Sequence, residues 1–400
     1  MAFQVSPGVL VQEKDLTRII PAVSTSIGAI AGTFTKGPMD EVVSISSEQE
    51  LVSTFGKPNN SNFEDFFSAS NFLQYSNALR VVRVQNSSVS NATESGSAFV
   101  IKNTIDYTNN YAAGQASVGL WAARTAGAHG NSLQISTCPS ATAYEEVNKT
   151  TVADAAMAVG DTVVTVSSAT GISAGDIVNF GDQYEYRVIS VSTNDLNIVR
   201  KEEPAYFGTS ESSGLHQAPT NGAQVRRRWK YYDLFNKAPG TSPAVSAKGG
   251  SGDELHIVVI DEDGEITGTK GDVLETFEAV SKASDAKDAQ GNVNYYPDVI
   301  YKSSNYIYWM DHNAGGSNWG SAANGTTFTD VTAVSNVSLQ SGSDGTTATT
   351  GQRKTAYEKF EDGETVDVGL IIAGAGDATH IGNLITIAEN RKDAVVFASP

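Results

Sequence analysis

A glycine-rich turn near the end of the sequence has the residue types that could bind a nucleotide. Gly374–Thr379, with the sequence GAGDAT, follows an apolar stretch and precedes a helical pattern. A dinucleotide fingerprint occupies the same context, because backbone N–H groups at a helix N-terminus bind pyrophosphate. Here Thr379 replaces the third glycine of that fingerprint. We therefore interpret the segment as a strand-to-helix turn with Asp377 as the N-cap, and nucleotide binding remains the alternative.

The acidic stretch Asp261–Asp272 could supply carboxylate ligands to a calcium ion. An EF-hand loop needs glycine at position 6 and a bidentate glutamate at position 12. In this stretch the first glycine, Gly264, is at position 4, and position 12 is Asp272. The sequence therefore favours a hairpin turn over a metal site.

The remaining residues match no catalytic or metal-binding signature. The histidines lack the spacing of a zinc protease, and neither a G-x-S-x-G elbow nor a P-loop occurs. The only cysteine, Cys138, can form neither an intrachain disulfide nor a cysteine-based metal site. We predict no enzyme activity, no catalytic, cofactor-binding or metal-binding residues, and no cofactor. The histidines, expected to be surface or hydrogen-bonded core residues, are His129, His216, His256, His312 and His380.

One basic run, RRRWKYY at residues 226–232, combines cations with aromatic rings in the manner of a nucleic-acid surface. The whole chain has 27 Lys and Arg against 45 Asp and Glu, a net charge of −18. Such a charge disfavours binding to nucleic acid or to an anionic membrane. We interpret the run as forming ion pairs within the chain or with an acidic neighbour. The sequence also has no signal peptide and no long apolar stretch, so we expect a soluble protein made in the cytoplasm.

The first part of the sequence has the pattern of helices and strands that is typical of an α/β protein. Pro7-Gly8 interrupts residues 1–22, which we expect to form an extended arm. Strands are predicted at residues 23–34 and 79–84. The order strand, helix, helix, strand in this part of the chain is typical of an α/β layer.

Two capping boxes predict the helices between these strands. Ser47 with Glu50 opens the first helix, and Ser61 with Glu64 opens the second. The second helix is expected to place four apolar side chains on one face. These are Phe63, Phe66, Phe67 and Leu73.

Residues 141–218 have a different, all-β character. Four short strand patterns are separated by glycine and Asn-Asp turns, which is typical of a small β-barrel or sandwich. Further along, residues 256–260 are expected to pair with Ile266 across a tight turn. A helix is predicted over residues 272–283 from apolar residues at i, i+4 and i+7. These are Val273, Phe277 and Val280.

The α/β pattern returns at the end of the sequence. Strands are predicted at residues 366–373 and 394–398, on either side of a helix that begins after Asp377. A parallel sheet needs both faces covered, so we expect residue 400 to be a truncation or a limit of order. The apolar face predicted for the helix consists of Ile381, Leu384, Ile385 and Ala388.

Five blocks of the sequence, in order, resemble the sheath subunit of contractile phage tails of the large T-even-like type. The first is SPGV at residues 6–9 with Glu13, which is similar to the N-terminal arm of that family. The most recognisable block runs from GTFTKGP at residues 32–38 through SNFLQY at 70–75 to LRVVR at 79–83. The remaining blocks are residues 261–282, LQSGSDG at 339–345, and residues 367–400.

The resemblance implies a multi-domain fold of the α/β and β classes. It predicts a discontinuous α/β sheath domain, a mixed α+β middle domain and an inserted small all-β domain that protrudes outward. The expected ranges are an arm at 1–22 that exchanges strands with neighbours, the sheath domain at 23–85 and 330–400, the middle domain at 86–140 and 219–329, and the β insertion at 141–218.

The resemblance also implies a structural function in the virion. Subunits of this family polymerise as stacked hexameric rings around a tail tube and contract to drive the tube through the host envelope for genome ejection. The implied partners are further copies of the chain, the tail tube protein, and the baseplate and tail terminator proteins. The alternatives are the sheath of a phage-derived injection device, such as a tailocin or secretion system, and a nucleotide-binding α/β enzyme.

Overall fold

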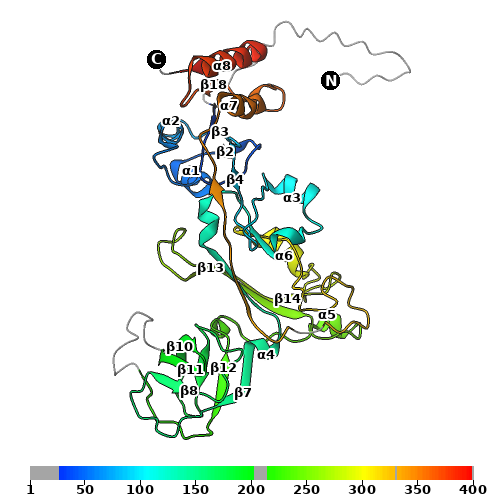
Figure 1. Ribbon diagram of the computed structural model, residues 1–400. Coiled ribbons are helices and arrows are strands. Elements are labelled where there is room, and N and C mark those ends of the chain that lie inside the picture. The colour runs from blue at the N-terminus through cyan, green and yellow to red at the C-terminus, as the bar shows by residue number, and fades with distance from the viewer. Residues whose placement is uncertain (1–26, 202–213, 329–330, 399–400) are drawn as a thin grey trace, which may run out of the picture. The chain divides into compact units, whose positions relative to one another are not determined.

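The computed structural model describes residues 27–201, 214–328 and 331–398. The described residues divide into two compact units, one formed by residues 27–87 and 346–398, the other by the described part of residues 88–345 (Figure 1). Both units combine helices and strands, so this is a mixed α/β protein with several sheets. The predicted arm at residues 1–22 lies outside the described residues.

The first unit is built on one five-stranded sheet in the order β19-β18-β1-β3-β2. The central strand β1 runs parallel to both β18 and β3, so strands from both ends of the sequence share this sheet. Strand β2 is antiparallel to β3, and β19 is parallel to β18. The elements are β1 (Gly28–Gly32), β2 (Val43–Ile45), α1 (Glu48–Phe55), α2 (Phe63–Leu73), β3 (Leu79–Arg83), α7 (Thr350–Tyr357), β18 (Leu370–Ile372), α8 (Ala378–Arg391) and β19 (Val395–Phe397).

Helices cover both faces of this sheet. On one face, Ile30 of β1 packs with Leu51 of α1 and Phe66 of α2. On the other face, Ala31 of β1 packs with residues of α7 and α8, including Leu384. Because alternate residues of β1 point to opposite faces, one short strand of small and branched residues contributes to both cores.

The structure corrects three sequence predictions in the first unit. Helix α2 has no capping box at Ser61: its N-cap is Asn62, whose side chain accepts a hydrogen bond from the backbone of Asn59 instead. Of the four apolar residues assigned to one face of α2, Phe63 and Phe67 are 48% and 49% exposed, because the buried side of the helix passes through Asp65, Phe66, Ala69 and Ser70. In α8 the buried residues are His380, Leu384 and Ile387, whereas Ile385 is exposed.

Two N-caps are confirmed. Ser47 accepts a hydrogen bond from the backbone N–H of Glu50, and Asp377 accepts one from the backbone N–H of His380. The first cap is not a reciprocal box, because the Glu50 carboxylate binds the backbone and hydroxyl of Ser46. The strand predicted at 366–373 is shorter than expected and covers only β18.

The second unit contains a four-stranded sheet, a six-stranded sheet and two small two-stranded sheets. Its elements are β4 (Val89–Ser90), α3 (Thr104–Asn110), β5 (Trp121–Ala123), β6 (Leu133–Cys138), α4 (Ala141–Tyr144), β7 (Glu145–Thr151), β8 (Val163–Thr165), β9 (Ile177–Asn179), β10 (Tyr186–Ser192), β11 (Asp195–Arg200), β12 (Gln224–Arg228), α5 (Pro243–Ser246), β13 (Glu254–Asp261), β14 (Asp272–Ser281), α6 (Tyr296–Ser303), β15 (Ile307–Trp309), β16 (Ser335–Ser338) and β17 (Ser343–Asp344).

The helix predicted over residues 272–283 is wrong: this stretch is strand β14. It pairs with β13, which lies between β14 and β6 and is buried throughout. Phe277 and Val280 are opposite Ile257 and Leu255, so β14 has one residue more than β13 at this point. Such a bulge brings residues three apart to the same face of a strand, and that spacing imitates a helix.

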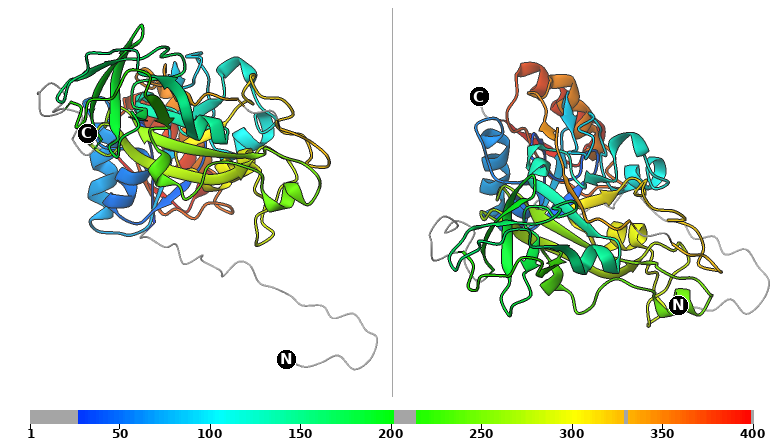
Figure 2. Two further views of the ribbon diagram at one scale, coloured as in Figure 1. Left: turned by 90° about the horizontal axis from the view of Figure 1, so that it is seen from below. Right: turned by 60° about the horizontal axis from the view of Figure 1, so that its bottom comes forward.

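The six-stranded sheet of the second unit closes on itself. Its order is β7-β12-β9-β10-β11-β8, and a bridge between Val152 and Val166 joins the chain beyond β7 to the chain beyond β8. The strands of this sheet are among the teal-to-green elements in Figure 2. Its interior is filled with apolar side chains such as Val188 and Leu196. The strands predicted between residues 162 and 199 are confirmed, but the sheet also includes β12, which lies beyond residue 218.

Candidate functional site

The Gly374–Thr379 turn connects β18 to α8, and carboxylates bind two of the backbone N–H groups at this turn. The Asp377 carboxylate accepts the N–H of His380 at 2.8 Å, and the Asp65 carboxylate accepts the N–H of Ala375 at 3.1 Å. A pyrophosphate would therefore meet two negative charges in place of N–H donors. The side chain of His380 is buried beside Gly376, where an added Cβ would be 2.2 Å from its Cδ2. The interpretation as a capped turn is confirmed.

A buried ion pair between Asp65 and Arg353 lies next to this turn. The guanidinium donates one hydrogen bond to each carboxylate oxygen, both at 3.0 Å, and the two residues are only 1% and 8% exposed. Asp65 also accepts hydrogen bonds from the backbone and hydroxyl of Thr33 at 2.9 and 3.0 Å. One carboxylate thus joins the end of β1, helix α2, helix α7 and the turn after β18.

Sequence reasoning missed this pair because its members are 288 residues apart. In the sequence, Asp65 has only the ordinary signature of a carboxylate in the first turn of a helix. The cavity that remains beside the pair is lined by residues 60–65, Arg353 and Ala375, and measures about 130 Å³. This is smaller than the ~300–1,000 Å³ of typical small-molecule sites.

The acidic stretch Asp261–Asp272 forms the connection between β13 and β14, and Asp261 organises it. Its carboxylate accepts hydrogen bonds from the Ser132 hydroxyl at 2.5 Å and from the N–H groups of Gly264, Ile266 and Thr267. Burial opposes the charged form of Asp261, but these hydrogen bonds outweigh it and lower its pKa. The connection is longer than the tight turn predicted before Ile266, because β14 begins only at Asp272. The Asp261 carboxylate accepts hydrogen bonds from backbone N–H groups of this connection. In the described part of the chain, no cluster of three or more His, Cys, Asp or Glu could hold a metal ion.

Two of the histidines, His256 and His312, bind neighbouring groups of the protein through hydrogen bonds. The His256 ring is fully buried, accepts the N–H of Ala279 at its Nδ1 atom and binds the carbonyl of Lys237 through its Nε2 atom. Burial lowers the pKa of His256, which favours the neutral ring. Each of the two ring nitrogens has a hydrogen-bond partner on the backbone. The His312 ring binds the hydroxyls of Tyr295 and Tyr296.

The basic run lies on β12 and the segment that follows it, and ion pairs within the chain neutralise it. Arg226 and Arg228 both pair with Glu145, at 3.3 and 3.2 Å. Arg227 is 2% exposed and faces Glu146 and Asp176. The predicted pairing of these cations within the chain is confirmed.

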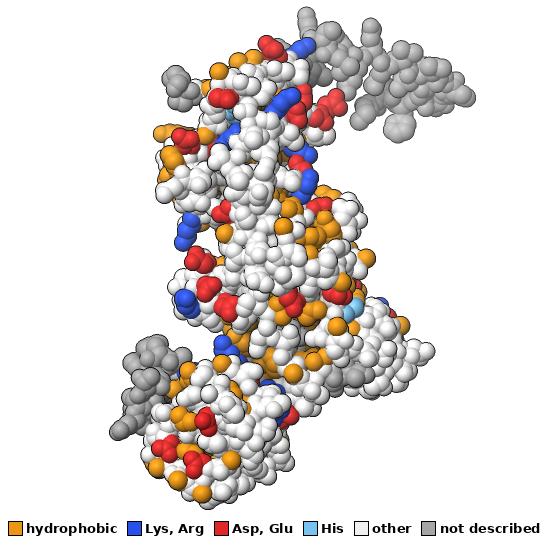
Figure 3. Space-filling model, in the orientation of Figure 1, with side chains coloured by type: hydrophobic (Ala, Val, Ile, Leu, Met, Phe, Trp, Pro, Cys, Tyr) orange, Lys and Arg blue, Asp and Glu red, His pale blue; other side chains and the backbone are white. Residues whose placement is uncertain are grey.

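The first unit presents exposed apolar side chains on one helix and one edge strand. Tyr75, just after α2, is 91% exposed, and Phe63 and Phe67 on α2 are about half exposed; apolar side chains are visible over this helix in Figure 3. At the edge of the sheet, Val395 and Phe397 of β19 are 58% and 55% exposed. Exposed apolar side chains on an open sheet edge are typical of surfaces that bind another chain. None of the described helices is both long and apolar enough to cross a lipid bilayer.

The sequence of this chain is similar to those of several known proteins. Residues 25–84 match the family model described as the N-terminal region of domain III of the tail sheath protein Gp18. The tail sheath protein of Salmonella phage ViI is 27% identical over 100% of this chain and 60% of its own length. That of Enterobacteria phage T4 is 26% identical over 99% of this chain and 62% of its own length. A shorter match, 36% identical over 26% of this chain and 15% of the relative, is to the tail sheath protein of Vibrio phage KVP40.

The chain thus spans about 60% of the length of the curated relatives that match it throughout. Among solved structures, a sheath tail protein from Listeria innocua is 10% identical with a TM-score of 0.37, covering 92% of this chain and 44% of that one. The matched region 25–84 contains β1, β2, α1, α2 and β3, and its helix α2 carries Asp65 and the exposed Phe63 and Phe67.

Proposed function

This chain is related to the tail sheath proteins of contractile-tailed bacteriophages, and on that premise we propose that it is a structural subunit of such a sheath. It polymerises as stacked hexameric rings around a tail tube, and the sheath contracts to drive the tube through the host envelope for genome ejection. The observation that carries this proposal is the match of the whole chain to tail sheath proteins from two phages.

The domain organisation that we propose follows the sheath pattern. Residues 1–22 form an arm that adds a strand to the sheet of a neighbour, and residues 23–85 with the C-terminal part of 330–400 form the sheath domain; residues 331–345 contain β16 and β17 of the second unit. Residues 141–218, together with β12, form an outward β insertion within a middle domain. The sharing of one sheet by β1 and β18 supports the sheath-domain assignment, because it joins segments from both ends of the sequence.

The subunit acts mechanically and has no enzymatic role. Its partners are further copies of the chain, the tail tube protein, and the baseplate and terminator proteins, and its place is the virion. The carboxylates of Asp65 and Asp377 at the β18–α8 turn support this proposal against a nucleotide-driven enzyme, because they place two negative charges where a phosphate would bind. The internal pairing of the basic run supports the absence of direct nucleic-acid binding.

Deletion of residues 1–22 from the full-length protein tests the proposal. We expect the intact protein to form sheath-like tubes in negative-stain electron microscopy, and the deletion variant to remain monomeric with an unchanged circular dichroism spectrum. The physical reason is that strand addition between subunits supplies main-chain hydrogen bonds that no other described element replaces. Monomers at every concentration of the intact protein would contradict the sheath function. Loss of the fold on deletion would show that the arm is an ordinary core strand.

A further inference from the structure

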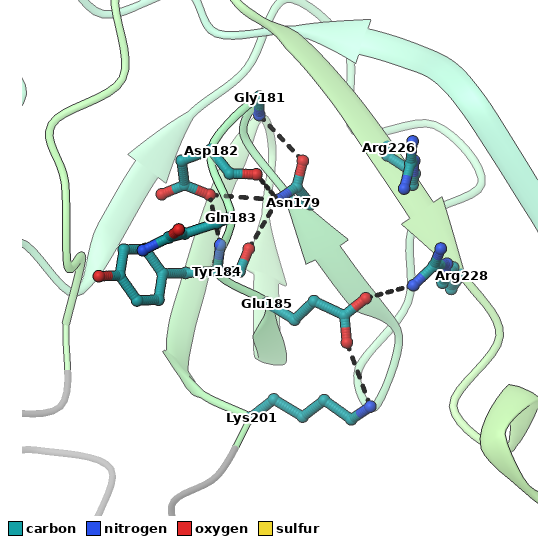
Figure 4. Close-up of a pocket in the computed structure, with 9 residues that line it drawn as sticks. All are labelled: Asn179, Gly181, Asp182, Gln183, Tyr184, Glu185, Lys201, Arg226 and Arg228. Carbon is teal, nitrogen blue, oxygen red and sulfur yellow. Dashed lines mark hydrogen bonds and ion pairs between the residues drawn. The ribbon is translucent and has the colours of Figure 1, made fainter.

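A wide polar cavity opens on the barrel of the second unit, on the segment from β9 to β10 and along β12. It measures about 760 Å³ and is lined by Asn179, Gly181, Asp182, Gln183, Tyr184, Glu185, Lys201, Arg226 and Arg228 (Figure 4). Figure 4 shows residues 179–184 on one side, the two arginines of β12 on the other, and Glu185 between them. This volume is within the ~300–1,000 Å³ of small-molecule sites, and neither the barrel nor the proposed sheath function explains it.

The wall formed by residues 179–184 is held rigidly by its own hydrogen bonds. The side-chain amide of Asn179 donates to the carbonyls of Asp182 and Tyr184, both at 2.7 Å. The carboxylate of Asp182 accepts the N–H of Tyr184 at 3.1 Å. The ring of Tyr184 is stacked on His216 with 4.1 Å between the ring centroids. A preorganised wall with a fixed aromatic ring reduces the entropy cost of binding a ligand.

The floor of the cavity is a fixed network around Glu185. Its carboxylate accepts hydrogen bonds from the Tyr232 hydroxyl at 2.7 Å and from Lys201 at 3.1 Å, and it also pairs with Arg228. Lys201 and Arg228 lie over the Tyr232 ring, 4.4 and 4.9 Å from its centroid. The network presents hydrogen-bond donors and acceptors together at nearly balanced charge.

Arg226 is the cation of this site with the most binding capacity left. Only its Nε atom is paired, with Glu145 at 3.3 Å, and its side chain is 40% exposed. Within the described ranges, the two terminal nitrogens of the Arg226 guanidinium have no hydrogen-bond partner in the protein, and the exposed side-chain amide of Gln183 has none either. Two parallel N–H groups of a guanidinium match a carboxylate in a bidentate geometry.

We propose that this cavity is a binding site for an acidic oligosaccharide, one whose sugar rings carry carboxylates. Arg226 pairs with a ring carboxylate, Gln183 and the Glu185 network exchange hydrogen bonds with the hydroxyls, and Tyr184 supplies a flat aromatic surface for a sugar ring. A purely anionic ligand such as phosphate fits less well, because Asp182 and Glu185 both line the cavity. The carboxylates repel a dense negative charge but accept hydrogen bonds from hydroxyl groups.

Titration of the 400-residue chain with trigalacturonic acid, followed by saturation-transfer NMR, tests the site. We expect saturable binding of trigalacturonic acid, and weaker binding of the neutral trisaccharide maltotriose. R226A is expected to weaken trigalacturonic acid binding by roughly tenfold or more, because a charge-assisted hydrogen-bond pair is lost. Q183A removes an exposed amide without touching an ion pair and is expected to weaken both sugars.

The matched control is K230A, which removes a positive charge from the same run outside the cavity lining. It should leave the affinity unchanged. The proposal is overturned if K230A and R226A weaken binding equally, if triglutamate or inorganic phosphate binds as tightly as trigalacturonic acid, or if no sugar binds. These outcomes are independent of sheath assembly, since binding is measured on the isolated chain.

Discussion

Replacing Arg353 by methionine should destabilise the first unit selectively. The substitution keeps most of the side-chain volume but leaves the Asp65 carboxylate, 1% exposed, without its guanidinium partner. Loss of one member of a buried ion pair typically costs about 3–5 kcal/mol, because the remaining charge stays desolvated. Asp65 keeps the N–H groups of Thr33 and Ala375, which places the expected cost toward the lower end of that range.

Lys354 provides the matched control on the same helix. Its amine pairs with Glu358 at 3.4 Å in an i, i+4 arrangement, and its side chain is 48% exposed. An exposed helical pair of this kind contributes only about 0.3–0.5 kcal/mol. R353M and K354M therefore remove the same charge from neighbouring positions, with expected costs that differ by roughly sixfold or more.

Hydrogen exchange and tryptophan fluorescence separate the two units in this experiment. All four tryptophans, at positions 121, 229, 309 and 319, belong to the second unit, so the urea transition of their fluorescence should not move in R353M. Amides of β1 and β18 should exchange roughly 100-fold faster or more, since each 1.4 kcal/mol is a factor of ten. In K354M they should exchange at nearly the native rate.

The double variant D65N/R353M tests the cause of this loss. Asparagine removes the buried charge and keeps one oxygen, which can accept from Thr33, whose N–H and hydroxyl both bind Oδ2, but not also from the N–H of Ala375 on Oδ1. Because removal of a desolvated charge outweighs the loss of one backbone hydrogen bond, the double variant should still be more stable than R353M alone. Equal exchange rates in R353M and K354M would refute the assignment of the pair as a buried clamp. A double variant less stable than R353M would refute the desolvated charge as the source of the loss.

Two further predictions concern groups that the structure buries. Burial lowers the pKa of His256 in the folded protein, although Glu254 and Glu278 oppose the shift, so the neutral ring stabilises the fold fully above about pH 6.5 and this stabilisation is lost as the pH falls below that value. H256Q should therefore flatten the pH dependence of the fluorescence-detected urea midpoint between pH 7.5 and 5.5. An unchanged slope would contradict this prediction. Millimolar ATP or NAD should leave the melting temperature unchanged, because the carboxylates of Asp65 and Asp377 bind two N–H groups at the β18–α8 turn and would repel a phosphate there. A rise of the melting temperature with nucleotide concentration would contradict the proposed structural role of that turn.

Local signals in the sequence predicted the parts of the fold that depend on neighbouring residues. The caps at Ser47 and Asp377 join a side chain to an N–H three residues ahead, so the sequence alone contains both partners. The strand β14 was not predictable in this way, because its conformation depends on pairing with the buried strand β13 and on a bulge. The bulge puts Phe277 and Val280 on one face with the spacing of a helix, and only the partner strand distinguishes the two structures.

The cavity on the barrel could not be predicted from the sequence either, because its binding groups also depend on residues that are distant in the sequence. The basic run at residues 226–232 was visible in the sequence, and its pairing within the chain was predicted correctly. Which cation retains free donors depends on the positions of Glu145 and Glu185, which come from other strands or turns of the barrel. Sequence spacing does not distinguish Arg226 from Arg227, although one is 40% exposed in its side chain and the other 3%.

The Asp65–Arg353 pair lies at the position of the sheet where open parallel sheets commonly bind a ligand. In an open parallel sheet, ligands bind beyond the carboxyl ends of the strands where the connections diverge to opposite faces. Here that point lies between β1, which continues into α1 and α2 on one face, and β18, which continues into α8 on the other. Asp65 and Arg353 fill this position and bind the residues that follow both strands, Thr33 and Ala375. The crevice that holds a ligand in such sheets is here filled by an ion pair that joins segments from the two ends of the sequence.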